Sequence, residues 1–391
     1  MKRLCVLILA LALAAFMVAP AFATWTRVVT MGNQNMYIQD DYNVWMWPST
    51  VNNYPRHLII DHSVSAGSEA FGYSEDMDGG TRVGMIVPFM KKSVLGGFIS
   101  DFDKDWDLNP AEADQRIDLF YGYRATNFDL GLHFDYYGAG EEWGGKQSQN
   151  AYGLTVGAGF NLNGNMLELS GLYRTIGWKN ETLDTSSPTV INEKDSGSDL
   201  GLAARYLVAY NSMVTLVPAF SYRQQKVGEK VDAVSGQTGE EYKTTAWDLG
   251  VGCNTVPLQG TEFLTSIGVR SYAATYGDTA ASLYDDWSFQ SMPYIAFGSE
   301  IQVKNWLQFR FGAEKTWNTY KDNTTTPEHK ETRPDGQDLD FQYMVGAGIM
   351  VGDLQFDVEV NPNWFNAGPY FLSGENNGNM FGWISIKYDY R

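Results

Sequence analysis

Apolar and polar residues alternate with a period of two in segments of about ten residues that recur from residue 57 to the C-terminus. In the segment 127–137, apolar side chains occupy the even positions, and Asp129, Gly131, His133 and Asp135 fall between them. The segments 354–360 and 384–390 show the same pattern. Because successive side chains of a strand point to opposite faces, each segment predicts a strand with one apolar and one polar face.

The connections between these segments alternate between short and long. Longer polar connections, such as 103–114, 179–197, 226–241 and 318–338, separate seven short ones. The short ones are Lys91-Lys92, Ala125–Asn127, Asn161–Asn165, Tyr210–Ser212, Val256–Gly260, Val303–Asn305 and Gly352-Asp353. Outer-membrane barrels obey this rule, with tight periplasmic turns and long outer loops. A soluble sandwich has no reason to obey it, because its two ends are equivalent.

Counting strands from the turns gives the size of the barrel. Seven hairpins supply 14 strands from Arg82 to Val360, and a closing strand at Met380–Tyr390 adds one. A long first strand from His57 to about Tyr73, kinked at Gly67, makes 16. We therefore predict an all-β protein, a transmembrane antiparallel up-and-down β-barrel over residues 57–391, with both termini periplasmic. Fourteen strands is the alternative if the first and last segments lie inside the barrel.

The N-terminus has the features of a secretory signal peptide over residues 1–23. A basic start (Met1-Lys2-Arg3) precedes the apolar stretch Leu4–Ala19 and the cleavage pattern Ala21-Phe22-Ala23. We expect the mature chain to begin at Thr24. No later run approaches the roughly 18 apolar residues of a membrane helix.

Charge and composition narrow the class of protein. The formal charge of −18 at pH 7 excludes a nucleic-acid partner, because an acidic chain repels phosphate backbones. Beyond the expected signal peptide Cys253 is the single cysteine, so no internal disulfide is expected.

Aromatic residues make up 14% of the chain, and many fall near expected strand ends. Those near long connections are Trp178, Trp287, Trp317 and Trp364, and those beside short turns are Tyr123, Tyr210 and Trp306. They indicate two interfacial girdles, although aromatics are common in any strand.

The last predicted strand, Gly382 to Tyr390, is similar to the C-terminal signal read by the barrel insertion machinery. It departs from that signal by ending in Arg391, where such barrels usually end in an aromatic residue. The chain as a whole resembles the Gram-negative outer-membrane β-barrels. That resemblance implies a place in the outer membrane, with lipid, lipopolysaccharide and the insertion machinery as partners.

Residues 24–56 precede the barrel and carry a narrower resemblance. The order Gly32, Asp40-Asp41, Asn43 and Pro48 is similar to the N-terminal hatch of the FadL/TodX/PorV family. Trp47-Pro48-Ser49 stands where that family typically has Asn-Pro-Ala. Its members take up fatty acids or aromatic hydrocarbons, or serve protein secretion. The resemblance implies a plug, with the residues Asp40, Asp41, Asn43, Trp45, Trp47 and Pro48. We expect Asp40 and Asp41 to meet lumen arginines or strand-end amides.

Arginines fall on the polar face of the predicted strands, which must line the lumen because a lipid-facing arginine costs about 2–4 kcal/mol at the midplane. The candidate lumen residues are Arg116, Arg124, His133, Arg174, Arg205, Arg223, Arg270, Arg310 and Glu314. One interpretation is a charged constriction that sets selectivity. The other is a wall of ion pairs that braces a filled barrel.

Signatures of catalysis are missing from the sequence. The four histidines have no metal-binding spacing, and no G-x-S-x-G motif occurs. We therefore predict no enzyme activity, no metal and no cofactor. The leading function is passage of small molecules across the outer membrane, with a hydrophobic cargo favoured by the hatch-like segment. A general diffusion porin with a charged lumen is one alternative, and a surface barrel acting as an adhesin or an anchor is another.

Overall fold

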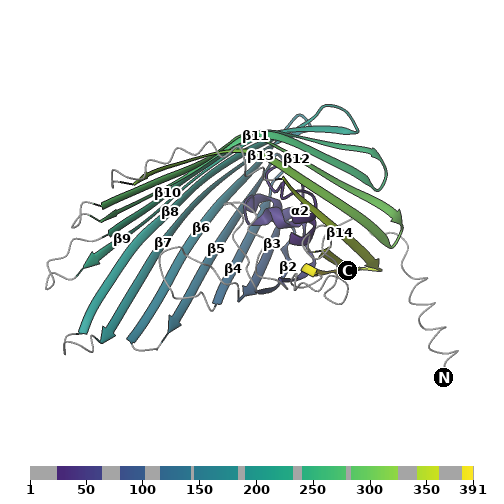
Figure 1. Cartoon of the computed structure of the whole chain (residues 1–391). Helices are drawn as coiled ribbons and strands as arrows, with labels where there is room; N and C mark the ends of the chain where they lie inside the picture. The colour runs from purple at the N-terminus through teal and green to yellow at the C-terminus, as the bar shows by residue number, and fades with distance from the viewer. Residues whose placement is uncertain are drawn as a thin grey trace, which may run out of the picture.

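The computed structural model is a closed barrel of 16 antiparallel strands with the N-terminal segment inside it (Figure 1). It describes residues 24–63, 80–101, 115–141, 145–183, 190–231, 240–278, 283–324, 341–360 and 381–390. The expected signal peptide, 1–23, lies outside the described residues.

Every strand pairs with its neighbours in the sequence, and β1 closes the barrel against β16. The strands are β1 (His57–Ser63), β2 (Thr81–Met90), β3 (Ser93–Ser100), β4 (Gln115–Arg124), β5 (Phe128–Glu141), β6 (Gly145–Leu162), β7 (Asn165–Leu183), β8 (Val190–Ala209), β9 (Val214–Val231), β10 (Glu240–Leu258), β11 (Thr261–Asp278), β12 (Leu283–Lys304), β13 (Leu307–Thr324), β14 (Phe341–Val351), β15 (Leu354–Val360) and β16 (Phe381–Asp389).

The first and last strands belong to the barrel wall, which decides between the two predicted strand counts. His57 pairs with Asp389, and Ser63 pairs with Trp383. The prediction of 16 strands is confirmed, and the alternative of 14 is wrong. The described part of the first strand ends at Ser63, so the predicted kink at Gly67 lies outside the described residues.

All seven short turns lie where the alternation placed them, although three were predicted too long and the turn at 210–213 was predicted one residue too short. The strands continue to Leu162, Leu258 and Lys304, which leaves two-residue turns at 163–164, 259–260 and 305–306. The ladder accommodates the extra residues as register shifts between Thr255 and Leu258 and between Gln302 and Lys304. Asn163 and Gly164 have φ of 55° and 89°, the left-handed pair that a type I′ hairpin turn requires.

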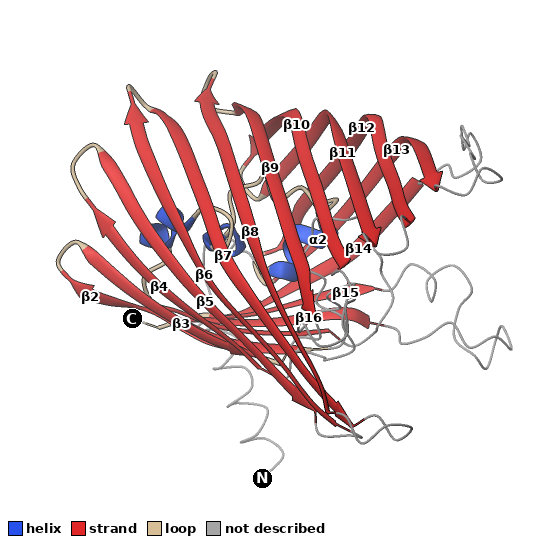
Figure 2. Ribbon diagram, turned by 90° about the vertical axis from the view of Figure 1, so that its left-hand side faces the viewer, coloured by secondary structure: helices blue, strands red, loops and turns tan. Residues whose placement is uncertain are grey.

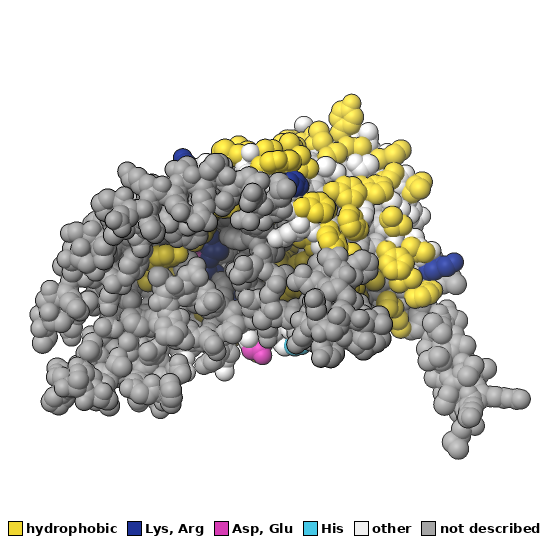
Figure 3. Space-filling view, viewed as in Figure 1, with side chains coloured by type: hydrophobic (Ala, Val, Ile, Leu, Met, Phe, Trp, Pro, Cys, Tyr) yellow, Lys and Arg dark blue, Asp and Glu magenta, His cyan; other side chains and the backbone are white. Residues whose placement is uncertain are grey.

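The alternation places apolar side chains outside and polar side chains inside, as predicted. Leu119 is 51% exposed on the outer face, whereas its neighbour Asp118 is fully buried in the interior. Hydrophobic side chains gather on the part of the outer wall that is drawn in colour at the upper right of Figure 3. Trp306, in the turn before β13, and Trp317 of β13 are both exposed. Eleven residues of a strand tilted by about 40° rise roughly 28 Å, close to the height of the apolar band of an outer-membrane barrel.

The strands differ in length around the barrel. Strands β6 to β13 have 18 to 22 residues, whereas β1 to β4 and β14 to β16 have 7 to 11. A span needs about 9–11 residues, so one side of the wall rises well beyond the bilayer on the side of the long connections. Figure 2 shows this taller side. None of the helices among the described residues is long and apolar enough to cross a membrane.

The N-terminal segment forms one short α-helix and two 3₁₀ turns within the barrel (Figure 2). These are α2 (Trp25–Thr30), η1 (Asp41–Val44) and η2 (Pro48–Asn53). Thr24 caps α2 through its hydroxyl, Asp40 and Asn43 form a capping box at η1, and Pro48 begins η2.

Glycines on the lumen face allow this segment to approach the wall. A Cβ at Gly131 would lie 2.0 Å from the backbone of Pro48, and a Cβ at Gly298 would lie 2.4 Å from the Met31 carbonyl. A Cβ at Gly312 would lie 2.3 Å from the backbone nitrogen of Gly32. The absence of a side chain at these three wall positions therefore sets the path of the segment.

Candidate functional site

Arg27 fixes the start of the N-terminal segment to the barrel wall. Its guanidinium, which is buried, pairs with Asp40 at 3.1 Å, with Glu262 of β11 at 2.6 Å and with Glu300 of β12 at 2.8 Å. Burial opposes the charge, but the three carboxylates raise the pKa of Arg27 above its ordinary value. One cation thus holds the segment and two strands together.

The two aspartates of the segment have partners other than those predicted. Asp40 pairs with Arg27 of the same segment, and Asp41 accepts a hydrogen bond from Lys387 Nζ of β16 at 2.7 Å. The expectation that both would meet lumen arginines or strand-end amides is wrong. Arg310, for example, is already bonded to strand carboxylates, whereas Lys387 faces the segment directly. Burial raises the pKa of Asp40 and of Asp41 above the ordinary carboxylate value.

Asn43 and Trp47 lie against β8. Arg205 donates hydrogen bonds to the Ile38 carbonyl at 2.9 Å and to Asn43 Oδ1 at 3.1 Å, and it pairs with Glu168 of β7. Its guanidinium lies 4.8 Å from the centre of the Trp47 ring. Arg205 therefore satisfies backbone and side-chain acceptors that the segment presents to the wall.

Trp45 lies in an aromatic cluster that joins the segment to β3 and β4. Its ring stacks on Tyr42 with a centroid distance of 5.1 Å, and it meets Phe98 and Phe120 edge-on. The Arg82 guanidinium lies 3.8 Å from the centre of the Trp45 ring. Tilted and edge-on contacts of this kind fix ring orientation as well as bury apolar area.

The remaining candidate lumen residues are ion-paired rather than gathered at one constriction. Arg116 and His133 share Asp118, Arg174 bridges Asp135 and Asp199, and Arg223 also pairs with Asp199. Arg310 bridges Glu300 and Asp357, Arg270 pairs with Glu314, and Arg124 pairs with Asp129 and donates to Asn53 of the segment. The geometry matches the interpretation in which ion pairs brace a filled barrel.

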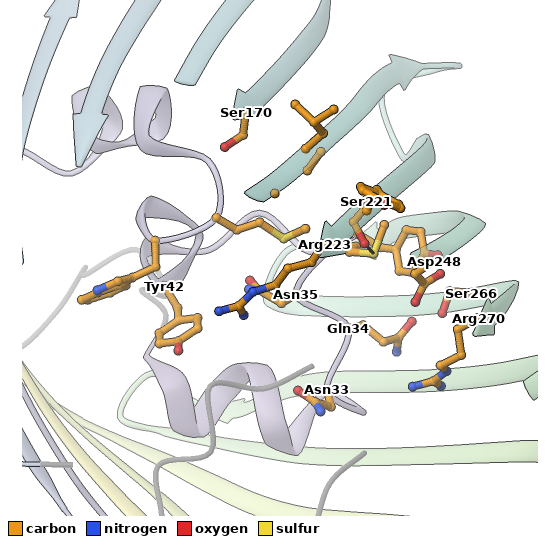
Figure 4. Close-up of a pocket in the computed structure, with 18 of the residues that line it drawn as sticks. Asn33, Gln34, Asn35, Tyr42, Ser170, Ser221, Arg223, Asp248, Ser266 and Arg270 are labelled. Carbon is orange, nitrogen blue, oxygen red and sulfur yellow. Dashed lines mark hydrogen bonds between the residues drawn. The ribbon is translucent and has the colours of Figure 1, made fainter. Parts of the chain in front are cut away.

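A cavity of about 230 Å³ lies between the N-terminal segment and strands β6 to β13 (Figure 4). One end, the aromatic end, consists of Trp25, Tyr42, Trp45 and Met46. The other, the polar end, consists of Gln34, Ser266, Arg270 and Glu314. Aliphatic side chains such as Leu172, Ala203 and Ala296 line the wall. Arg223, Arg270 and Glu314 are the predicted lumen residues that the structure brings to this cavity, and Trp45 is the predicted plug residue.

A chain of hydrogen bonds borders the polar end. Tyr294 of β12 donates to Asp248 Oδ1 of β10 at 2.8 Å, and its hydroxyl lies 2.5 Å from that of Tyr37. The Arg270 guanidinium lies 4.2 Å from the centre of the Tyr294 ring. Burial raises the pKa of Tyr37 above its ordinary value, so this hydroxyl stays protonated. The chain ties the segment to two strands beside the cavity.

Several of these residues were not predicted from the sequence. Arg27 is the single basic residue between Thr24 and Pro55, and this isolation could have singled it out in the sequence. Tyr294 and Ser266 fall on the lumen face of their strands, but the alternation does not distinguish cavity-lining positions from other lumen positions. Gln34 had no signal, because its position depends on the path of the segment. Among the described residues, no group of three or more His, Cys, Asp or Glu side chains could hold a metal ion.

Polar atoms without hydrogen-bond partners among the described residues occur at the cavity-lining positions. They are Gln34 Oε1, Ser266 Oγ, Arg270 Nε and the indole nitrogens of Trp25 and Trp45. Gln34 and Ser266 are buried, and the Arg270 side chain is 12% exposed. Buried polar atoms normally find partners, so these atoms mark the cavity as a place where a ligand can supply them.

No protein-family model matches the sequence, and no curated protein is similar to it. Solved structures of barrels are similar in fold. A Pseudomonas aeruginosa FadL homologue is 14% identical with a TM-score of 0.46, over 96% of this chain and 100% of that chain. The Ralstonia pickettii toluene transporter TbuX is 9% identical with a TM-score of 0.40, over 94% and 99%. The unliganded ferric citrate transporter FecA is 8% identical with a TM-score of 0.48, over 78% of this chain and 51% of its own, so this chain spans about half its length.

Proposed function

We propose that this protein is an outer-membrane channel that passes small hydrophobic compounds through its barrel by way of the cavity. The observation that carries the proposal is the position of the N-terminal segment. Its residues pack across the lumen against Gly122 and Gly131, which flank the short turn 125–127. The cavity lies further from the short turns, between the segment and the middle of the long strands.

The direction of passage follows from the orientation expected of such barrels. We place the short turns and both termini in the periplasm and the long connections at the cell surface. A compound entering from outside would meet the cavity before it meets the segment. Aromatic and aliphatic side chains would then hold an apolar molecule out of water while the segment blocks ions.

The described charges argue against an open diffusion porin. Each candidate lumen arginine already pairs with a carboxylate, and Arg27 inside the lumen pairs with three. Rings of uncompensated charge, which set selectivity in pores, are a different arrangement. The segment that obstructs the lumen also carries the aromatic end of the cavity.

Dye uptake and conductance together test this proposal. Cells expressing the protein should admit N-phenyl-1-naphthylamine, an apolar dye, faster than cells with an empty vector. The purified protein in a planar bilayer should show little ion conductance. Large steady conductance without faster dye uptake would instead identify a diffusion porin. If the protein shows neither faster dye uptake nor conductance, the remaining alternative is a surface barrel that acts as an adhesin or an anchor.

The matched variant lacks residues 24–53, which removes α2, η1 and η2 and keeps β1. It should form a barrel whose ion conductance clearly exceeds that of the full chain. Unchanged conductance would show that the segment does not close the lumen, and it would remove the main support for hydrophobic passage.

A further inference from the structure

Three atoms without partners gather at the polar end of the cavity. The strand register places Ser266 of β11, Ala296 of β12 and Glu314 of β13 side by side. The Arg270 guanidinium reaches this row, since its Nη2 donates to Glu314. Gln34 lies beside the same row, because Gly32, two residues before it, packs against the Phe297 and Ala313 carbonyls and near Gln34 Nε2. Figure 4 shows Gln34, Ser266 and Arg270 near one another, away from Tyr42.

The hydrogen-bonding roles of these atoms are fixed by their neighbours. Gln34 Nε2 donates to the Met31 carbonyl at 2.8 Å, so the oxygen Oε1 is the atom left to accept. Arg270 Nε can only donate, because a guanidinium has no acceptor. Ser266 Oγ can do either. A complementary ligand group must therefore offer both a donor and an acceptor.

The charges at this end disfavour an anionic ligand. Arg270 faces two carboxylates, Glu314 through an ion pair and Asp248 across the β10–β11 register. Arg223, the other cation of the lining, donates to both oxygens of Asp199. Among the described residues near the polar end, negative charge is thus at least as abundant as positive charge. A carboxylate placed there could accept from Arg270 Nε and Ser266 Oγ, but it would leave Gln34 Oε1 without a donor and would meet two like charges.

We propose that the cavity binds an uncharged amphipathic compound, an aromatic or aliphatic body with one donor–acceptor group such as a primary amide. The body lies against Trp25, Tyr42 and Trp45, and the amide lies at the polar end. Its N–H donates to Gln34 Oε1, and its carbonyl accepts from Arg270 Nε or Ser266 Oγ. This inference rests on the proposed function, because it names the class of compound that uses the same cavity.

The test compares three probes with one body: 4-butylbenzamide, the anion 4-butylbenzoate and the hydrocarbon butylbenzene. Binding to the purified full-length protein is followed by quenching of tryptophan fluorescence at pH 7.5. The amide should bind about tenfold more tightly than either of the others, the effect of one to two net hydrogen bonds. Equal affinity for amide and hydrocarbon, or tightest binding of the benzoate, would overturn the proposed ligand class.

Variants locate the effect. Ser266→Ala and Gln34→Leu should lower amide affinity several-fold and leave butylbenzene affinity unchanged, because they remove hydrogen-bonding atoms and keep the apolar wall. Thr265→Val is the matched control, since Thr265 precedes Ser266 and is exposed on the opposite face of β11. If Ser266→Ala and Gln34→Leu retain the amide preference as fully as Thr265→Val does, the amide does not bind at the polar end. Faster uptake of apolar dye together with no amide preference would refute this inference and leave the proposed function standing.

Discussion

Replacing Arg27 with methionine should release the N-terminal segment from the lumen while the barrel stays folded. Arg27 is buried against Asp40, Glu262 and Glu300, all within 3.1 Å of it. Methionine keeps most of the side-chain volume but leaves these carboxylates without that cation. When the segment leaves, Glu262 and Glu300 face water, and Glu300 keeps its ion pair with Arg310. The penalty therefore falls on docking of the segment rather than on the wall.

The size of the effect follows from the cost of breaking a buried ion pair. Removing one partner typically costs about 3–5 kcal/mol, which lowers the ratio of docked to released segment roughly 150- to 4,000-fold. The net free energy of docking is the small difference between the gain from burying apolar side chains and the entropic cost of ordering about thirty residues. A penalty of this size is enough to shift the equilibrium measurably.

Conductance and proteolysis measure the released state. Arg27→Met should conduct ions better than the unmodified protein in a planar bilayer, and a protease should cut it faster between residues 24 and 56. Arg27→Lys, which keeps the charge but loses the planar fork, should fall between the two. The exposed Arg56 offers a control, since Arg56→Met removes a cation at the end of the same segment. Unchanged conductance and protease resistance in Arg27→Met would refute the assigned role of this residue.

Three further results are expected. Gly131→Ala should displace the segment and raise conductance, because its Cβ would lie 2.0 Å from the Pro48 backbone; Gly171→Ala, with its nearest atom at 3.7 Å, should not. Leu119→Arg should reduce insertion into lipid vesicles, at a cost of about 2–4 kcal/mol near the midplane, whereas Leu119→Met should insert normally. Docking of the segment should strengthen as pH falls, because a docked Asp40 with a raised pKa holds its proton more tightly than a released one. The change in docking should occur at pH values above 3.8, the ordinary pKa of an aspartate. A protease should therefore cut the segment more slowly at pH 5 than at pH 8. Asp40→Asn should reduce this difference in cleavage rate.

The wall of the barrel was readable from the sequence because it depends on local pattern. Period-two alternation set the faces, and the short turns set the strand count, so the hairpin from β4 to β5 followed from residues 115–141 alone. Two of the errors in turn length arose where the ladder absorbs extra residues as register shifts. Such register shifts do not change which residues are apolar or polar, so the alternation along the sequence cannot reveal them.

The interior was readable only in part, because its contacts join residues far apart in the chain. Arg27 and Glu300 are 273 positions apart, and Lys387 and Asp41 are 346 apart. Alternation gives the face on which a side chain lies but not its partner, so the partners assigned to Asp40 and Asp41 were wrong. The FadL-like order of Gly32, Asp40, Asp41 and Pro48 pointed to a segment inside the barrel. It gave no information on which strands the segment would contact.

One signal in the sequence does mark where the segment lies. A barrel with a water-filled lumen has polar residues inside, yet Ile86, Phe98, Phe120, Leu264 and Met344 are buried there against the segment. These apolar positions interrupt the polar face, and together with the lumen glycines they outline the surface that the segment covers. The polar end of the cavity, where Gln34 of the segment lies, carries no such apolar residues. Releasing the whole segment would expose this apolar surface to water, whereas a local shift near Gln34 would not. Passage of a compound from the cavity therefore favours a local movement of the segment over its complete release.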